Sequence, residues 1–214
     1  MQTLKAQENQ KFGAGLNVSD NLVNLALGNY KYVGGFSVEP VFLFKINKLQ
    51  YIKTIVGYSK VSKTLDLISE YPSQQKLGYI NEGIYFKVGI FTGFKSCTEL
   101  FHNSFGLSLF YSQFNENGDV TIKGSYFGDY YHEFKSYGQK MLFLEPGFDI
   151  ILYHNSFLSF SMSIKFPIKI YSSTKDQFPN YYIPGYGETM TNKEFNFAYI
   201  LYRFEFYFIV PFGN

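Results

Sequence analysis

The chain of 214 residues has no tryptophan, a single cysteine and few charged residues. Charged residues make up 17% of it, below the roughly one quarter that is usual in soluble domains. The formal net charge is only +2, so no basic field attracts nucleic acid, and we expect no nucleic-acid partner. Because Cys97 is the single cysteine, a disulfide within the chain is excluded.

Long apolar runs are missing as well. No window reaches the ~18 uninterrupted apolar residues of a transmembrane helix. The histidines His102, His132 and His154 are scattered and lack the spacing of metal ligands. The chain also has no glycine-rich phosphate loop and no paired-carboxylate signature. We therefore expect no metal and no cofactor.

Aromatic residues, in contrast, are abundant at 21% of the chain. The segment 195–212 shows how they are arranged, because apolar and polar positions alternate along it. One face includes Phe206 and Phe208, while the other holds Arg203 and Glu205. Alternation with a period of two residues predicts a β-strand with two chemically different faces.

The same pattern recurs along the whole chain and predicts eight strands. Ser19 and Asp20 can cap a short helix over residues 21–27, between the first and second strands. Pro40 predicts a bulge or bend in the second strand. The expected strands are residues 11–17, 32–46, 50–63, 78–94, 104–114, 139–153, 158–170 and 195–212.

The connections alternate between short turns and longer segments, of which residues 115–138 and 172–193 are the longest. We expect the ends of residues 115–138 to extend the flanking strands. An even number of strands with short turns at one end is typical of bacterial outer-membrane proteins. We therefore predict an all-β, eight-stranded antiparallel transmembrane β-barrel with periplasmic termini. We interpret residues 1–6 as a signal-peptide remnant and residues 7–214 as a single barrel domain.

The width of such a barrel predicts which face is inside. An eight-stranded interior holds only its own side chains, and the aromatic rows would overfill it. A soluble ligand-binding barrel, the alternative with an apolar interior, would carry denser Lys and Glu outside. We therefore expect the polar rows to face inward, where charges of both signs form a structural network. These residues are Glu39, Lys45, Lys53, Lys87, Glu145, Asp149, Lys165, Lys169, Arg203 and Glu205.

The last strand also resembles an outer-membrane insertion signal, because apolar and mostly aromatic residues alternate almost to the end of the chain. The residues of this signal are Phe204, Phe206, Phe208, Val210 and Phe212.

Several stretches resemble one family of Bacteroidota outer-membrane β-barrels, known only as a domain of unknown function. Residues 180–186 (NYYIPGY) are similar to its "YIPGF" loop, and residues 208–212 (FIVPF) to its final "YLIPL". Residues 83–90 and 158–169 resemble its "GSYLKVGF" and "LGFSVRLKRL" strands, although the family's usual tryptophans are lacking. The resemblance implies location and fold and no enzymatic activity.

These observations predict a non-catalytic accessory or structural subunit of a larger outer-membrane complex, such as protein insertion or export machinery. Its partners would be outer-membrane lipid and other outer-membrane proteins. The alternative is a lipid-modifying enzyme that uses His132 beside Glu133, or His154 near Ser156 and Ser159. None of these residues forms a recognisable catalytic signature.

Overall fold

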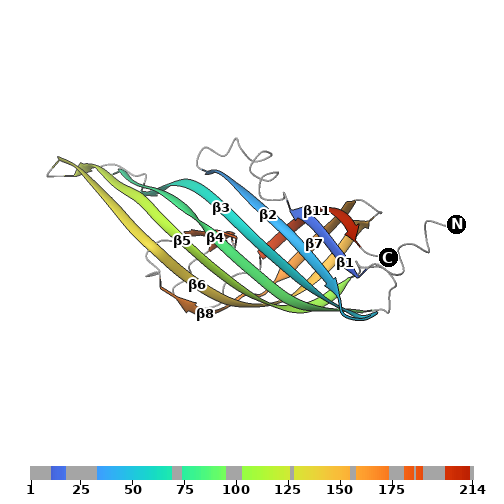
Figure 1. Cartoon of the computed structure of the whole chain (residues 1–214). Helices are drawn as coiled ribbons and strands as arrows, with labels where there is room; N and C mark the ends of the chain where they lie inside the picture. Colours follow the sequence, from blue (N-terminus) through green and yellow to red (C-terminus); the bar gives the residue numbers. More distant parts are fainter. Residues whose placement is uncertain are drawn as a thin grey trace.

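The computed structural model describes residues 11–17, 33–68, 74–94, 103–125, 128–154, 158–173, 181–185, 187–189 and 201–212. Every regular element within these residues is a β-strand (Figure 1). The prediction of an all-β chain is thereby confirmed, while the helix expected at residues 21–27 lies outside the described residues.

One large antiparallel sheet contains nine of the strands in the order β5-β4-β3-β2-β1-β11-β7-β6-β8, with a further pairing between β5 and β6. Strands β7 and β8 follow one another along β6, so the sheet has eight strand positions. Its strands are β1 (Phe12–Asn17), β2 (Val33–Lys45), β3 (Gln50–Ile68), β4 (Gln74–Gly93), β5 (Ser104–Ser125), β6 (Gly128–His154), β7 (Leu158–Lys165), β8 (Ile168–Ser172) and β11 (Leu201–Phe212).

Strands β3 to β6 are longer than predicted, and the loop expected at residues 115–138 is wrong. Strands β5 and β6 pair along this whole stretch, up to Ser125 opposite Gly128. The prediction followed apolar alternation, which stops where the outward positions become polar, as at Asn115 and Asn117. Backbone pairing does not need apolar side chains, so the ladder continues beyond them.

Two expectations about prolines also change. The expected bulge at Pro40 is absent, because the pairs Val38–Tyr58 and Val41–Ile55 keep the same register. The pairing with β3 nevertheless skips Glu39 and Pro40, as expected for a proline that has no N–H to donate to the ladder. The single strand expected at residues 158–170 is instead interrupted between β7 and β8, where Pro167 lies.

The segment expected as a loop at residues 172–193 contains a small hairpin. Strand β9 (Tyr181–Ile183) pairs with β10 (Gly187–Thr189) in a separate two-stranded sheet. Gly185 lies between them with φ 77°, a left-handed conformation that favours glycine. Residues 195–200 of the last predicted strand lie outside the described residues, and β11 begins at Leu201.

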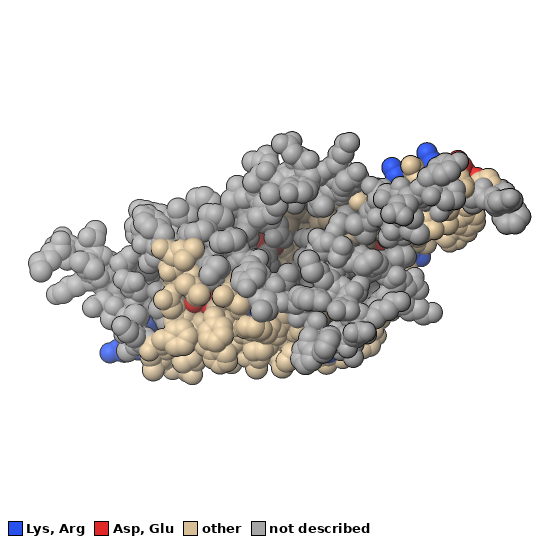
Figure 2. Space-filling model, turned by 180° about the vertical axis from the view of Figure 1, so that it is seen from behind, with Lys and Arg blue, Asp and Glu red and all other residues tan. Residues whose placement is uncertain are grey.

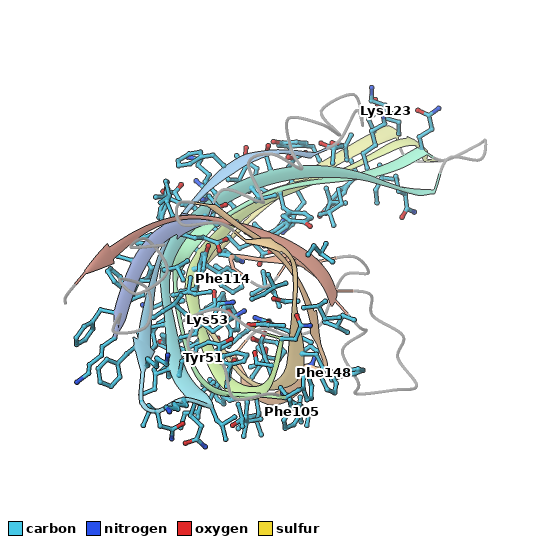
Figure 3. All side chains as sticks on the ribbon, turned by 90° about the vertical axis from the view of Figure 1, so that its right-hand side faces the viewer. Tyr51, Lys53, Phe105, Phe114, Lys123 and Phe148 are labelled. Atoms are coloured by element: carbon cyan, nitrogen blue, oxygen red, sulfur yellow. The ribbon has the colours of Figure 1, made fainter. Side chains whose placement is uncertain are left out.

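The large sheet curls, so that one face is concave and the other is outward. In Figure 3, Tyr51, Lys53 and Phe114 lie on the concave side, while Phe105 and Phe148 point away from it. Burial alternates accordingly: in β4, Ile84 and Ile90 are exposed, whereas Tyr85 and Lys87 are buried. The expected exposed apolar face is thus present among the described side chains, whereas the buried face is mixed, with charged residues such as Lys87 beside apolar ones such as Phe110.

Because the concave face is closely packed, we expect replacement of Gly57 by a larger residue to lower stability. A side chain here would meet the ring of Tyr85 on the neighbouring strand. We expect Gly57→Leu to lower stability by about 1–3 kcal/mol, because overpacking forces the ring and the backbone to move. The control is Val56→Leu, one residue earlier on the exposed face. Thermal unfolding of both variants tests this, and equal melting temperatures would contradict it.

Candidate functional site

A cluster of buried charges lies on the concave face. The Lys53 ammonium lies 3.2 Å from a carboxylate oxygen of Asp149, and the two side chains are only 6% and 7% exposed. The hydroxyl of Ser163 donates a hydrogen bond of 2.8 Å to the other oxygen of Asp149. This second bond stabilises the carboxylate, which would otherwise lose most of its solvation.

A second group in the cluster centres on Glu145. Its carboxylate lies 3.0 Å from the ammonium of Lys87 and 4.0 Å from that of Lys165. These side chains come from β4, β6 and β7, which are brought together only by the pairing of the sheet. Two cations around one buried anion are the arrangement expected for a structural charge network.

Apolar clusters lie on both sides of these charges. Lys53 lies 5.7 Å from the ring centre of Phe91, which packs with Leu43 and Tyr51. Lys87 lies 5.1 Å from the ring centre of Phe110, in a second cluster. That larger cluster consists of Val41, Ile55, Tyr85, Phe110, Phe114, Met141, Phe143 and Ile183.

Sequence reasoning missed these inward apolar residues, because it assumed inward rows of small residues and charges. The two-residue period of each strand could have predicted that these apolar residues face inward. Val41 has the same parity as Glu39, and Phe143 the same parity as Glu145. Residues of one parity on a strand share a face, so each of these apolar side chains had to point inward.

The other predicted network residues lie at different places. Glu39 is buried, whereas Lys45 and Lys169 are half-buried. In the register of the sheet, Arg203 is opposite Ser163, and Glu205 is opposite Ser161. The structure therefore gathers Lys53, Lys87, Glu145, Asp149 and Lys165 into the cluster and places the backbone of Arg203 beside it.

The segment 181–185 packs against the concave face next to the larger apolar cluster. Ile183 belongs to that cluster, and Pro184 accepts a hydrogen bond of 3.0 Å from the buried hydroxyl of Ser112. Gly185 lies against the ring of Tyr85, where a side chain would collide. Ile183, Pro184 and Gly185 thus help to fill the interior of the curled sheet.

The outward face changes character partway along the strands. The outward row from Ile84 on β4 to Phe94, just past its end, is apolar except for Thr92. Before this row comes Glu82, which binds the ammonium of Lys60 at 2.9 Å. The tyrosine hydroxyls of Tyr58 and Tyr111 donate hydrogen bonds toward this polar end, to Glu82 at 2.6 Å and to Gln113 at 3.1 Å. An apolar band with a tyrosine border results.

Beyond this border, paired β5 and β6 extend further, and their outward residues are polar and aromatic. Tyr131 donates a hydrogen bond of 3.1 Å to the carboxylate of Glu133. The bond and the nearby negative charge raise the pKa of Tyr131, because losing the phenol proton would break the bond and bring two anions together.

Of the histidines proposed for catalysis, only His132 has a described side chain. His132 is exposed and stacks on Tyr130 with ring centres 6.3 Å apart. The backbone of His154 is opposite that of Ser159, while Ser156 lies outside the described residues. No group of three potential metal ligands occurs in the described part of the chain. The described residues include no helix that is long and apolar enough to cross a membrane.

Comparison with known proteins found no matching family model, no matching curated protein and no matching solved structure. The resemblance to the outer-membrane family of unknown function therefore stays a prediction.

Breaking an ion pair of the buried cluster should lower stability far more than breaking an exposed ion pair. Asp149→Leu leaves the ammonium of Lys53 buried without this carboxylate, and we expect a loss of about 3–5 kcal/mol. The double variant with Lys53→Met should recover much of that loss. The control is Glu82→Leu, which breaks a pair that is 46% and 43% exposed and should cost about 0–1 kcal/mol.

A double-mutant cycle from unfolding in denaturant measures both effects. If Asp149→Leu costs no more than Glu82→Leu, the cluster does not have the structural role described here.

Proposed function

We propose that the chain is an eight-stranded β-barrel of the bacterial outer membrane that serves as a non-catalytic subunit of a larger membrane complex. The observation that supports it most is the apolar outward band around a sheet whose buried interior holds ion pairs.

The strand pairings support a closed barrel. They lead from β1 through β2, β3, β4, β5, β6, β7 and β11, and β11 pairs with β1. In the proposed barrel each of the eight strand positions would have a neighbour on both sides, and closure would remove unpaired edges. A membrane requires this, because its interior offers no water to satisfy backbone N–H and C=O groups.

The dimensions of the band support a membrane as its surroundings. The ten-residue rise from Ile84 to Phe94 spans about 33 Å along the strand. At a tilt of about 40°, this becomes about 25 Å, the height of the apolar band in outer-membrane barrels. Tyr58 and Tyr111 border the band with their hydroxyls at its polar edge, as interfacial aromatic residues do.

The charge distribution agrees with this placement. In Figure 2, the described surface is mostly uncharged, and the Lys and Arg atoms that are visible lie mainly toward the two ends of the molecule. A band of this kind can pack against lipid or against another membrane protein.

The filled interior supports a role without conduction. Two apolar clusters, the buried ion pairs and the segment 181–185 occupy the concave side. An eight-stranded barrel is only wide enough for such side chains, whereas water-filled channels need about twice as many strands. We therefore propose that the chain acts through contacts of its outer surface with other membrane proteins.

Two matched substitutions on β4 test the membrane placement. Ile90 and Ile80 are both exposed on the outward face, but Ile90 lies within the band and Ile80 beyond Glu82. We expect Ile90→Lys to destabilise the inserted protein by about 2–4 kcal/mol and to reduce insertion, because a lysine in the apolar layer loses its hydration. Ile80→Lys should behave like the original protein.

Membrane fractionation after an alkaline wash measures insertion. A protein that stays in solution without detergent, and that tolerates both lysines equally, would refute the proposal.

Purification from native membranes in mild detergent tests the assignment as a subunit. We expect outer-membrane proteins to co-elute with the tagged chain in fixed proportion, as measured by quantitative mass spectrometry. If the chain elutes alone and its loss changes lipid masses, the lipid-modifying alternative would replace this proposal. His132→Ala and His154→Ala would then test the catalytic residues.

A further inference from the structure

The two borders of the apolar band differ in charge. At one border, the exposed ammonium of Lys60 lies 2.9 Å from the carboxylate of Glu82, so these two charges offset each other. At the other border, where short turns join the strands, Lys11 and Lys48 are exposed. The described side chains at this end are those of residues 11–13, 43–52, 89–94, 103–107 and 147–152. Their one acidic residue, Asp149, is buried in an ion pair, so the described outer surface here carries positive charge only.

The apolar band continues into these short turns. The exposed row on β2 that includes Phe44 continues to Ile46, which lies past the end of the strand and is 47% exposed. Leu49 in the same turn is exposed, and so is Phe94, just past β4. The carbonyl of Leu49 accepts a hydrogen bond of 2.8 Å from the N–H of Gly93, so the two turns lie side by side. This end of the molecule therefore presents apolar side chains and lysines together.

The turn that carries Lys48 is held by its own hydrogen bonds. The side-chain oxygen of Asn47 accepts the N–H of Leu49 at 2.8 Å and that of Gln50 at 2.9 Å. The side-chain nitrogen of Asn47 donates to the side-chain oxygen of Gln50 at 2.9 Å. Lys48 thus lies in an ordered turn between exposed Ile46 and Leu49. A lysine in such a place lays its stem along apolar surface and keeps its ammonium in the polar layer.

Lys11 lies at the same border, on the neighbouring strand. The N–H of Lys45 donates a hydrogen bond of 2.8 Å to the carbonyl of Lys11, which continues the ladder that places Phe12 opposite Phe44. The rings of Phe12 and Phe44 are exposed, with their centres 5.0 Å apart. Lys45 is half-buried and has a partner of its own, so it is not counted here. Lys11 and Lys48 each lie next to exposed apolar side chains.

We propose that this border binds the phosphate groups of anionic phospholipids, with Lys11 and Lys48 as the cations that hold them. The acyl chains would lie along the apolar band, and the phosphates at the level of the short turns. Each lysine near a membrane surface raises the local preference for anionic lipid by roughly fivefold. This inference rests on the membrane placement proposed above and adds a lipid selectivity to it.

An acidic surface of another protein is the other occupant that the charge would attract. Lipid is favoured because the lysines adjoin the exposed apolar side chains of Ile46, Leu49 and Phe94. In a bilayer, the headgroup layer borders the hydrocarbon directly, so apolar side chains and cations are accommodated at the same edge. A solvated acidic protein surface would match the lysines and leave the apolar side chains unmatched.

Fluorescence quenching tests the lipid selectivity, and the lack of tryptophan in the chain allows a single reporter. Phe94→Trp places the reporter beside the proposed site, and Ile84→Trp places it at the opposite end of the band on β4. Each full-length variant is inserted into phosphatidylcholine vesicles that contain a minor fraction of lipid with brominated acyl chains. This brominated lipid is either phosphatidylglycerol or phosphatidylcholine. We expect phosphatidylglycerol to quench Phe94→Trp several-fold more strongly, and the two lipids to quench Ile84→Trp equally.

Lysine variants of the Phe94→Trp reporter test which residues cause the preference. Lys11→Gln together with Lys48→Gln should remove it, whereas Lys48→Arg should keep it, because arginine retains the charge. The matched control is Lys60→Gln, which removes an exposed lysine from the opposite border and should leave the preference unchanged. High salt should weaken the preference, because ions screen exposed charges.

The possible outcomes separate this inference from the membrane placement. If both brominated lipids quench Phe94→Trp equally, the lipid site is wrong while the membrane placement stands. If neither lipid quenches either reporter, the membrane placement fails, and this inference fails with it. If the Lys11→Gln and Lys48→Gln changes release co-purifying outer-membrane proteins and leave the lipid preference unchanged, the border binds protein, which overturns the lipid site.

Discussion

The backbone pairing of the sheet is the constraint on which the rest of this structure depends. Each strand position must satisfy its N–H and C=O groups against neighbours, and the side chains then alternate between two faces. Because the sheet curls, one face becomes a confined interior and the other an outer surface (Figure 3). The positions of the buried ion pairs, the aromatic clusters and the apolar band all follow from this single geometric fact.

The interior shows how a narrow space can hold charge. Lys53 with Asp149, and Lys87 and Lys165 with Glu145, lie between two apolar clusters whose aromatic rings approach the lysines. Pairing the charges reduces the cost of removing them from water, and the rings exclude that water. Segment 181–185, remote in sequence from most of the strands that it contacts, adds to the same packing. These contacts together fill the concave side of the sheet.

Much of the fold could be predicted, and the errors have identifiable causes. Strand positions and the exposed apolar face follow from local alternation, so residues such as Ile84 and Phe105 were assigned correctly. The extension of β5 and β6 was missed, because its outward residues are polar and its ladder is held by backbone bonds. The inward Phe110 and Phe143 were overlooked, although their parity placed them beside recognised inward residues.

Residue order alone settles the all-β class and which residues share a face, because both depend on a period that is read along one strand. It also predicts inward-facing charges, of which six are buried in the structure: Glu39, Lys53, Lys87, Glu145, Asp149 and Lys165. Only the folded chain decides which of them meet, since Lys53 and Asp149 are 96 positions apart and are brought within 3.2 Å by the register of several strands. The burial of Ile183, Pro184 and Gly185 against the concave face is likewise decided in three dimensions, because it depends on how the assembled sheet curls.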